Sequence, residues 1–287
     1  MFAIGVNPWI WTAPVTDQAL AALLPRLAGW GFDAVELPLA QFGDWSPQRV
    51  RDLLAEHGLT AAAVIPFTSP ERSLVRATPD TVRATQDHLR SMVDVAVMVG
   101  APTICGPMYA TVGQRWPMSA AERRECYAEL RRALEPVAEH AAANGVRIGL
   151  EPLNRYDTSV LNTVAQGLEA LDGLPDTVGL MIDSYHMNIE ESDPYGAVAL
   201  AGPRLVHVQV SGSDRGAPGS DHIDWPRWLD TLAGTGYRGP ICIESFTGEI
   251  EEMAVAAAVW RPLAPSQDRL ATDGLAYLRR LTERIPA

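Results

Sequence analysis

Four oxygen-bearing side chains stand at or near the ends of short apolar runs in the second half of the sequence. They are Glu151, Asp183, Gln209 and Glu244. Successive side chains of an extended strand point to opposite sides, so each polar group faces away from its apolar neighbours. Two glutamates, one aspartate and one amide oxygen form a hard, all-oxygen ligand set. This set suits Mn²⁺, Mg²⁺ or Co²⁺, and among these we favour Mn²⁺.

A single acid after a strand is more often a helix cap or a surface group than a metal ligand. The run Leu205–Val210 argues for an interior position, because its valines form one side and His207 and Gln209 form the other. Helices pack against the valine side, so the polar pair must face the interior of the sheet. Three carboxylates buried together repel one another unless a cation lies between them. The alternative is an accidental ring of acids stabilised by arginine.

Positioning these groups requires strands that alternate with helices. Short β-branched or apolar runs, each followed by a stretch of helical periodicity, predict eight strands. They are expected over Ala3–Val6, Ala34–Leu37, Ala61–Ile65, Thr103–Cys105, Arg147–Glu151, Gly179–Asp183, Leu205–Val210 and Ile241–Glu244. The clearest helices are Pro79–Met98, with Thr78 as its N-cap, and Ala120–Asn144, which ends in a left-handed turn before Gly145.

Such an alternation implies a parallel sheet with helical crossovers. Eight units in a chain of 287 residues predict an α/β fold, a (β/α)8 TIM barrel, as one domain over residues 1–287. We expect Phe246–Pro265 to be a long final loop and Ser266–Leu281 to be the last helix. Reactive groups of such barrels lie at the C-terminal ends of the strands. An open doubly wound sheet is disfavoured, because no glycine-rich phosphate loop follows the first strand.

The composition limits the classes of partner and compartment. A formal net charge of -12, without a basic stripe, argues against nucleic acid as a partner. Three scattered cysteines (Cys105, Cys126 and Cys242) favour a reducing compartment. The N-terminus lacks the basic region of a signal peptide, and no apolar run approaches the roughly 20 residues that span a bilayer. We therefore expect a cytoplasmic protein that does not bind membranes.

Further polar groups follow the same strands. Asp157 follows the fifth strand, His186 lies three residues beyond Asp183, and Arg215 follows the seventh strand. Each could simply cap a helix or a loop. Three other histidines fall in helical stretches and are expected to face solvent, and these are His57, His88 and His140. The role of His222 is left open.

The segments that carry these groups resemble the ketose 3-epimerases, the D-tagatose and D-allulose (D-psicose) 3-epimerase group of the xylose-isomerase-like barrels. The resemblance lies in GLEPLNRYDTSVLNT, MIDSYHMNIEESD, HVQVSGSDRGAPG and GPICIESF. Its most specific part is the stretch Asp183–Glu191. It extends over nearly the whole chain and includes GWGFDAVELPL near the start.

The resemblance implies a metal held by Glu151, Asp183, Gln209 and Glu244. Gln209 is a departure, because close epimerases carry His at this position. Related enzymes such as hydroxypyruvate isomerase look similar in using Gln there, so metal binding is retained. His207 would be the ligand only if the strand register shifted by two residues.

The family similarly implies a reaction: metal-dependent epimerisation at C3 of free ketoses through an enediolate. The substrates would be pairs of the types D-fructose/D-allulose, D-tagatose/D-sorbose and L-ribulose/L-xylulose. Glu151 and Glu244 would act as the acid and base on the two faces of the sugar. Asp157, His186 and Arg215 would bind the substrate, although Asp157 reaches less far than the Glu that close relatives often carry. The family also implies a homodimer or homotetramer.

Other functions fit parts of the same pattern. A related sugar isomerase or dehydratase, resembling hydroxypyruvate isomerase or inosose dehydratase, would also explain Gln209. An enzyme resembling endonuclease IV would require more histidine ligands and a basic face. A metal or sugar binder without catalysis would not require two opposed carboxylates.

Overall fold

Eight parallel strands form a closed barrel in the computed structural model, which describes residues 2–67, 69 and 71–284. Neighbours in sequence are neighbours in the ring, and the last strand pairs with the first. The strands are β1 (Ile4–Val6), β2 (Ala34–Leu39), β3 (Thr60–Pro66), β4 (Thr103–Gly106), β5 (Arg147–Leu150), β6 (Val178–Asp183), β7 (Leu205–Val210) and β8 (Ile241–Ile243). The predicted single-domain TIM barrel is confirmed. The expected bounds of 1–287 extend past the described residues at both ends.

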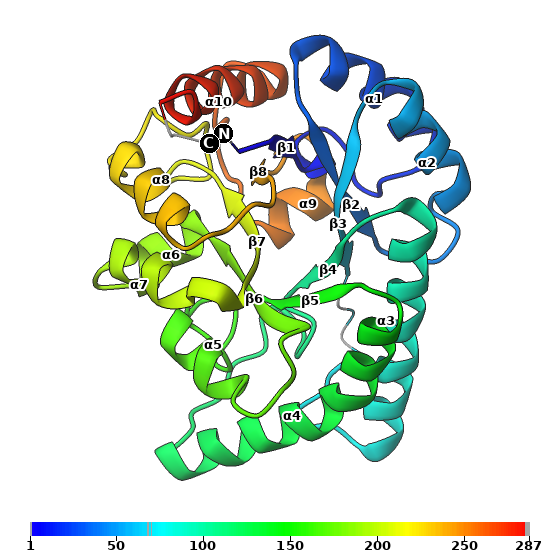
Figure 1. Ribbon diagram of the computed structural model, residues 1–287, viewed down its shortest axis with the longest axis vertical. Coiled ribbons are helices and arrows are strands. Elements are labelled where there is room, and N and C mark those ends of the chain that lie inside the picture. The colour runs from blue at the N-terminus through cyan, green and yellow to red at the C-terminus, as the bar shows by residue number, and fades with distance from the viewer. Residues whose placement is uncertain (1, 68, 70, 285–287) are drawn as a thin grey trace.

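Helices surround the barrel (Figure 1). They are α1 (Asp17–Trp30), α2 (Pro47–Glu56), α3 (Pro79–Val99), α4 (Ala120–Ala143), α5 (Val164–Ala170), α6 (Ser184–Glu190), α7 (Pro194–Ala201), α8 (Trp225–Gly234), α9 (Glu251–Ala256) and α10 (Gln267–Thr282), with short 3-10 turns at Pro8–Ile10 and Gly202–Arg204. The segment Phe246–Pro265 was expected to be a loop throughout, and this is wrong because α9 lies within it. The first turn of α9 contains Glu251 and Glu252, whose negative charges interact favourably with the helix dipole. No helix among these described segments is long and apolar enough to cross a membrane.

The helix ends follow from local sequence. The side chain of Thr78 accepts the backbone N–H of Thr81 and caps α3 as predicted. Ser119 and Glu122 form a reciprocal capping box at the start of α4. The expected left-handed turn after α4 is present at Gly145, with φ 69°. These signals fix where each helix begins and ends, and thus how each strand is delivered to the ring.

The alternation of side chains in β7 is as predicted. Its valines are buried toward the helices, whereas His207 and Gln209 make hydrogen bonds inside the barrel. The register places Gln209 beside Asp183 of β6 and beside Cys242 of β8. Gly179 permits the close approach of β6 to β7, because a Cβ there would collide with the carbonyl oxygen of Arg204. The strands therefore carry their polar groups to one level of the barrel.

One histidine prediction is wrong. His88 lies on the inner face of α3 and is buried rather than exposed to solvent. Its ring meets the ring of Phe42 edge-on, with 5.4 Å between centroids. Helical periodicity alone did not reveal that the loop after β2 covers this face of α3.

A cavity of about 470 Å³ opens at the N-terminal end of the barrel. Its lining includes the first residues of three strands, namely Thr103, Arg147 and Leu205. The polar groups expected to carry chemistry lie at the opposite end, just after or within the last residues of their strands. In barrels of this kind the C-terminal end carries function, so this cavity is not the candidate site.

Candidate active site

Three buried acids meet at the C-terminal end of the barrel, and we call them the carboxylate cluster. Asp183 ends β6, Glu151 follows β5 and Glu244 follows β8. All seven residues predicted from sequence are linked by contacts here, since Gln209, Arg215, His186 and Asp157 each contact the cluster or one another. The predicted set is therefore gathered at one place.

Arg215 joins two members of the carboxylate cluster. Its Nη1 donates to Asp183 Oδ2 and, at 3.1 Å, to Glu244 Oε2. The guanidinium also lies 4.2 Å from the centroid of the Tyr185 ring. The backbone of Arg215 has φ 67°, which is uncommon for a residue other than glycine. Ser245 Oγ donates to the carbonyl of Arg215 at 2.6 Å and helps to hold this conformation.

His186 faces the cluster, and both of its ring nitrogens lie beside N–H groups. The backbone N–H of Asn154 donates to Nδ1 at 3.0 Å, and Arg215 Nη2 lies 3.0 Å from Nε2. Nε2 lies 3.8 Å from Glu151 Oε1 and 3.9 Å from Asp183 Oδ2. Burial, together with the nearby Arg215, lowers the pKa of His186 to about 3. The imidazole is therefore neutral, and its Nε2 edge lies between Arg215 and the carboxylate cluster.

Asp157 stands at the margin of the site, 3.9 Å from His186 Nδ1. It accepts a hydrogen bond of 2.6 Å from Asn154 Nδ2. Burial raises the pKa of Asp157 above its usual value, although Asn154 and Arg215 oppose the shift. The contact through Asn154 links Asp157 to His186, so the two can act on one ligand.

The two glutamates hold protons unusually tightly. Burial raises the pKa of Glu244 to about 8, with Arg215 opposing the shift and Asp183 adding to it. Burial also raises the pKa of Glu151 well above its usual value, and Glu244 and Asp183 add to the effect. When all three acids are ionised, they carry more negative charge than Arg215 alone can balance, and a divalent cation would neutralise the excess.

One buried polar atom supports the same interpretation. Gln209 Oε1 has no hydrogen-bond partner among the described residues, whereas Gln209 Nε2 donates to Glu36 and to Glu244. Buried oxygens without partners are rare and require an explanation. Together with the three acids this amide oxygen completes an all-oxygen donor set, so the residues present fit a divalent cation.

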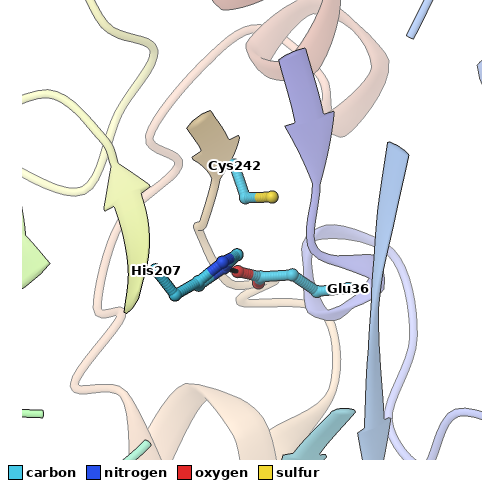
Figure 2. Close-up of side chains that lie close together, drawn as sticks. All are labelled: Glu36, His207 and Cys242. Carbon is cyan, nitrogen blue, oxygen red and sulfur yellow. Dashed lines mark hydrogen bonds and ion pairs between the residues drawn. The ribbon is translucent and has the colours of Figure 1, made fainter. Parts of the chain in front are cut away.

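A second buried group was missed by the sequence analysis. Glu36 of β2 and His207 of β7 reach toward each other across the barrel, and Cys242 of β8 lies beside them (Figure 2). Glu36 Oε1 and His207 Nε2 are 2.5 Å apart. The alternation used for the later strands could have found Glu36, because Val35 and Leu37 flank it in β2. The register does not shift by two residues, so Gln209 rather than His207 faces the carboxylate cluster.

Comparison with known proteins supports the resemblance seen in the sequence. The model of the xylose isomerase-like TIM barrel family matches residues 24–281. A probable ketose 3-epimerase from Synechocystis sp. is 34% identical over 96% of this chain and 95% of its own. A ketose 3-epimerase from Arthrobacter globiformis is 31% identical over 96% of this chain and 95% of its own.

A solved structure agrees with these relatives. The crystal structure of D-allulose 3-epimerase from Methylomonas sp. in complex with D-allulose superimposes with a TM-score of 0.88. It shares 31% sequence identity and covers 97% of this chain and 96% of its own. The chain belongs to the ketose 3-epimerases of the xylose isomerase-like TIM barrel family.

Proposed function

We propose that this protein inverts C3 of free ketoses in a reaction that depends on a divalent metal, with Mn²⁺ as the favoured ion. The observation that carries the proposal is the pair of buried glutamates, Glu151 and Glu244, which meet at the C-terminal end of the barrel. They follow β5 and β8, which lie three strands apart in a ring of eight. Inversion at a carbon requires a proton to leave on one face and return on the other, and two such groups can do this.

Each residue of the site has a role in this proposal. Glu151, Asp183, Gln209 and Glu244 would hold the metal. When bound, the metal supplies Lewis-acid polarisation of the substrate carbonyl, which acidifies the neighbouring C–H. One glutamate then takes the C3 proton, and the other returns a proton to the opposite face of the enediolate.

Three residues would orient the sugar. His186 and Arg215, whose Nε2 and Nη2 atoms lie 3.0 Å apart, would form hydrogen bonds with oxygens of the sugar. Asp157 can accept from a hydroxyl at the margin of the site. The complex of the Methylomonas relative with D-allulose supports a free sugar as the substrate class. The cytoplasmic location and the homodimer or homotetramer stay predictions.

A second candidate function is an isomerase or dehydratase reaction on a related sugar. It is favoured by Gln209, because the resemblance leads us to expect histidine at this position. The neutral amide gives the site a harder donor set than imidazole would. The same enzyme assay separates the two candidates.

The experiment is incubation of the purified protein with D-fructose, D-allulose, D-tagatose or L-ribulose, with Mn²⁺ or with EDTA, followed by chromatography. We expect the C3 epimer of at least one ketose with Mn²⁺ and none with EDTA. Formation of an aldose instead, or no product from any ketose, would contradict the proposal. Hydroxypyruvate and inosose would then be the next substrates to test.

A further inference from the structure

We propose that Glu36 is a positioning residue that orients the Gln209 carboxamide, so that Gln209 Oε1 faces the carboxylate cluster. This inference rests on the proposed function, because the oriented oxygen serves as a metal ligand there. Glu36 itself reaches toward His207 (Figure 2), and it accepts from the same Gln209 Nε2 atom as Glu244 does. It would therefore act through Gln209 rather than on the substrate.

Three N–H groups converge on the buried carboxylate of Glu36. Its Oε1 makes a hydrogen bond with His207 Nε2. Its Oε2 accepts hydrogen bonds from Asn7 Nδ2 and from Gln209 Nε2, both at 2.8 Å. The side chain has no measurable exposure to solvent. A buried carboxylate surrounded by donors is an acceptor, and every partner must turn a hydrogen toward it.

The orientation of the neighbouring amide of Asn7 is fixed independently. The backbone N–H of Trp9 donates to Asn7 Oδ1 at 3.0 Å, so Asn7 Nδ2 must face the acids. Asn7 Nδ2 then reaches both Glu36 Oε2 and, at 3.2 Å, Glu244 Oε1. Because Asn7 can only donate here, Glu36 Oε2 is an acceptor, and it accepts from Gln209 Nε2 as well.

Gln209 responds to two acceptors at once. Its amide nitrogen, Nε2, lies 2.8 Å from Glu36 Oε2 and 2.9 Å from Glu244 Oε1. If the amide turned over, its oxygen would face two carboxylate oxygens, and its NH2 group would lose both acceptors. Only one orientation is therefore stable, and it leaves Oε1 without a hydrogen-bond partner among the described residues.

An alternative role for Glu36 would be as a ligand of a second metal, with His207 and Cys242. The three donors already satisfy the carboxylate, so it has no need of a cation. The positioning role explains the orphaned oxygen of Gln209, and the second metal site does not.

The test is titration of the purified full-length protein with Mn²⁺, followed by electron paramagnetic resonance of the free ion. Glu36→Met keeps an unbranched side chain but removes the acceptor. We expect it to weaken Mn²⁺ binding by about 10–100-fold, the usual effect of losing the partner of a ligand. Glu36→Gln keeps one acceptor oxygen, and His207 can change tautomer to accept its NH2, so this variant should retain most of the affinity.

A double-mutant cycle separates orientation from general damage. In a Gln209→Ala background there is no amide to orient, so adding Glu36→Met should weaken Mn²⁺ binding by less than about twofold. Asp33→Asn is the matched control, since Asp33 precedes the same strand and accepts from Ile4 N and Arg279 at the other end of the barrel. It should leave Mn²⁺ affinity unchanged. If Glu36→Met does not fold, as judged by circular dichroism, Glu36→Leu takes its place in the cycle.

Several outcomes would overturn the inference. Unchanged affinity in Glu36→Met, or an equal loss with and without Gln209, would exclude positioning through the amide. A loss in Glu36→Gln as large as in Glu36→Met would assign the effect to charge. If the protein bound a second equivalent of Mn²⁺ and Cys242→Ser removed it, Glu36 would be a metal ligand rather than a positioning residue. Failure of the wild-type protein to bind Mn²⁺ would instead overturn the metal site of the proposed function, and this inference with it.

Discussion

The two glutamates of the carboxylate cluster differ in their surroundings, and this difference can be tested one residue at a time. Glu244 contacts Gln209, Asn7 and Arg215, whereas Glu151 lies nearest to His186. If each serves one face of the sugar, removing one should stop inversion without stopping proton removal on the other face. A single-base enzyme would lose both together.

Glu244→Gln should therefore lower the epimerisation rate by about 10²–10⁴-fold, the usual contribution of a general acid or base. In D2O, deuterium should still enter C3 of the one epimer whose C3–H faces Glu151, without inversion. Nuclear magnetic resonance of the recovered sugars measures both quantities. Asp33→Asn serves as the control and should epimerise at the wild-type rate. Exchange abolished in both epimers would contradict the two-base mechanism.

Arg215 has a structural role, because it balances Asp183 and Glu244. Arg215→Gln should destabilise the metal-free protein by about 3–5 kcal/mol, since it leaves buried acids without their partner. Mn²⁺ should recover much of this loss by supplying positive charge at the same place. Thermal unfolding with EDTA and with Mn²⁺ gives the comparison. An equal loss of Tm in both conditions would show that the cation does not replace the guanidinium.

At the scale of elements, α3 carries a buried histidine that makes the fold sensitive to acid. Burial, helped by Arg72, lowers the pKa of His88 from 6.5 to about 4. His88 Nε2 has no partner among the described residues, so a proton on the ring would gain nothing in the folded state. The unfolded chain therefore binds this proton first as the pH falls.

The contribution of His88 to stability is complete above pH 6.5 and is lost as the pH falls toward about 4, by an amount on the order of 3 kcal/mol. His88→Leu should remove this part of the pH dependence. Urea unfolding of both proteins at pH 7 and pH 5 provides the test. If the free energies of unfolding of the wild-type protein and of His88→Leu differed by the same amount at both pH values, the prediction would be wrong.

The strand β6 depends on a glycine for its place beside β7. Gly179→Ala should destabilise the protein by about 1–3 kcal/mol, because the added Cβ would meet the carbonyl oxygen of Arg204. Asp183 lies on the same strand, so weaker Mn²⁺ binding should accompany the loss. Gly29→Ala is the control: it has open space within α1 and should slightly stabilise the helix. Chemical denaturation and metal titration of both variants measure these effects.

Much of the fold and site could be predicted because both follow local rules. Alternation within β7 predicted that Gln209 faces the interior, and caps such as Thr78 marked the helix ends. What escaped prediction depends on contacts distant in sequence. The interior partners of Glu36 come from β1 and β7, and the cover over His88 comes from the loop that carries Phe42. No local pattern encodes such partners.

At the scale of the whole molecule, the site draws on strands from both ends of the chain. Asn7 follows β1, Glu36 lies in β2, and Glu244 follows β8. The C-terminal helix α10 packs beside β1, so the two ends of the chain lie together (Figure 1). Arg279 of α10 bonds Asp33, which precedes β2. The polar groups of the site are therefore carried by a ring that strands from the two ends of the chain close together.

Closure of the ring by β1 and β8 has a consequence for folding during synthesis on the ribosome. Asn7 and Glu244 are 237 positions apart, so their hydrogen bond cannot form until almost the whole chain has left the ribosome. Until then β1 presents an unpaired edge, which is open to wrong partners. At roughly 5–20 residues per second of synthesis, this exposure lasts on the order of ten seconds or more. Chaperone demand in the cell should therefore concentrate on nascent chains that have not yet made β8.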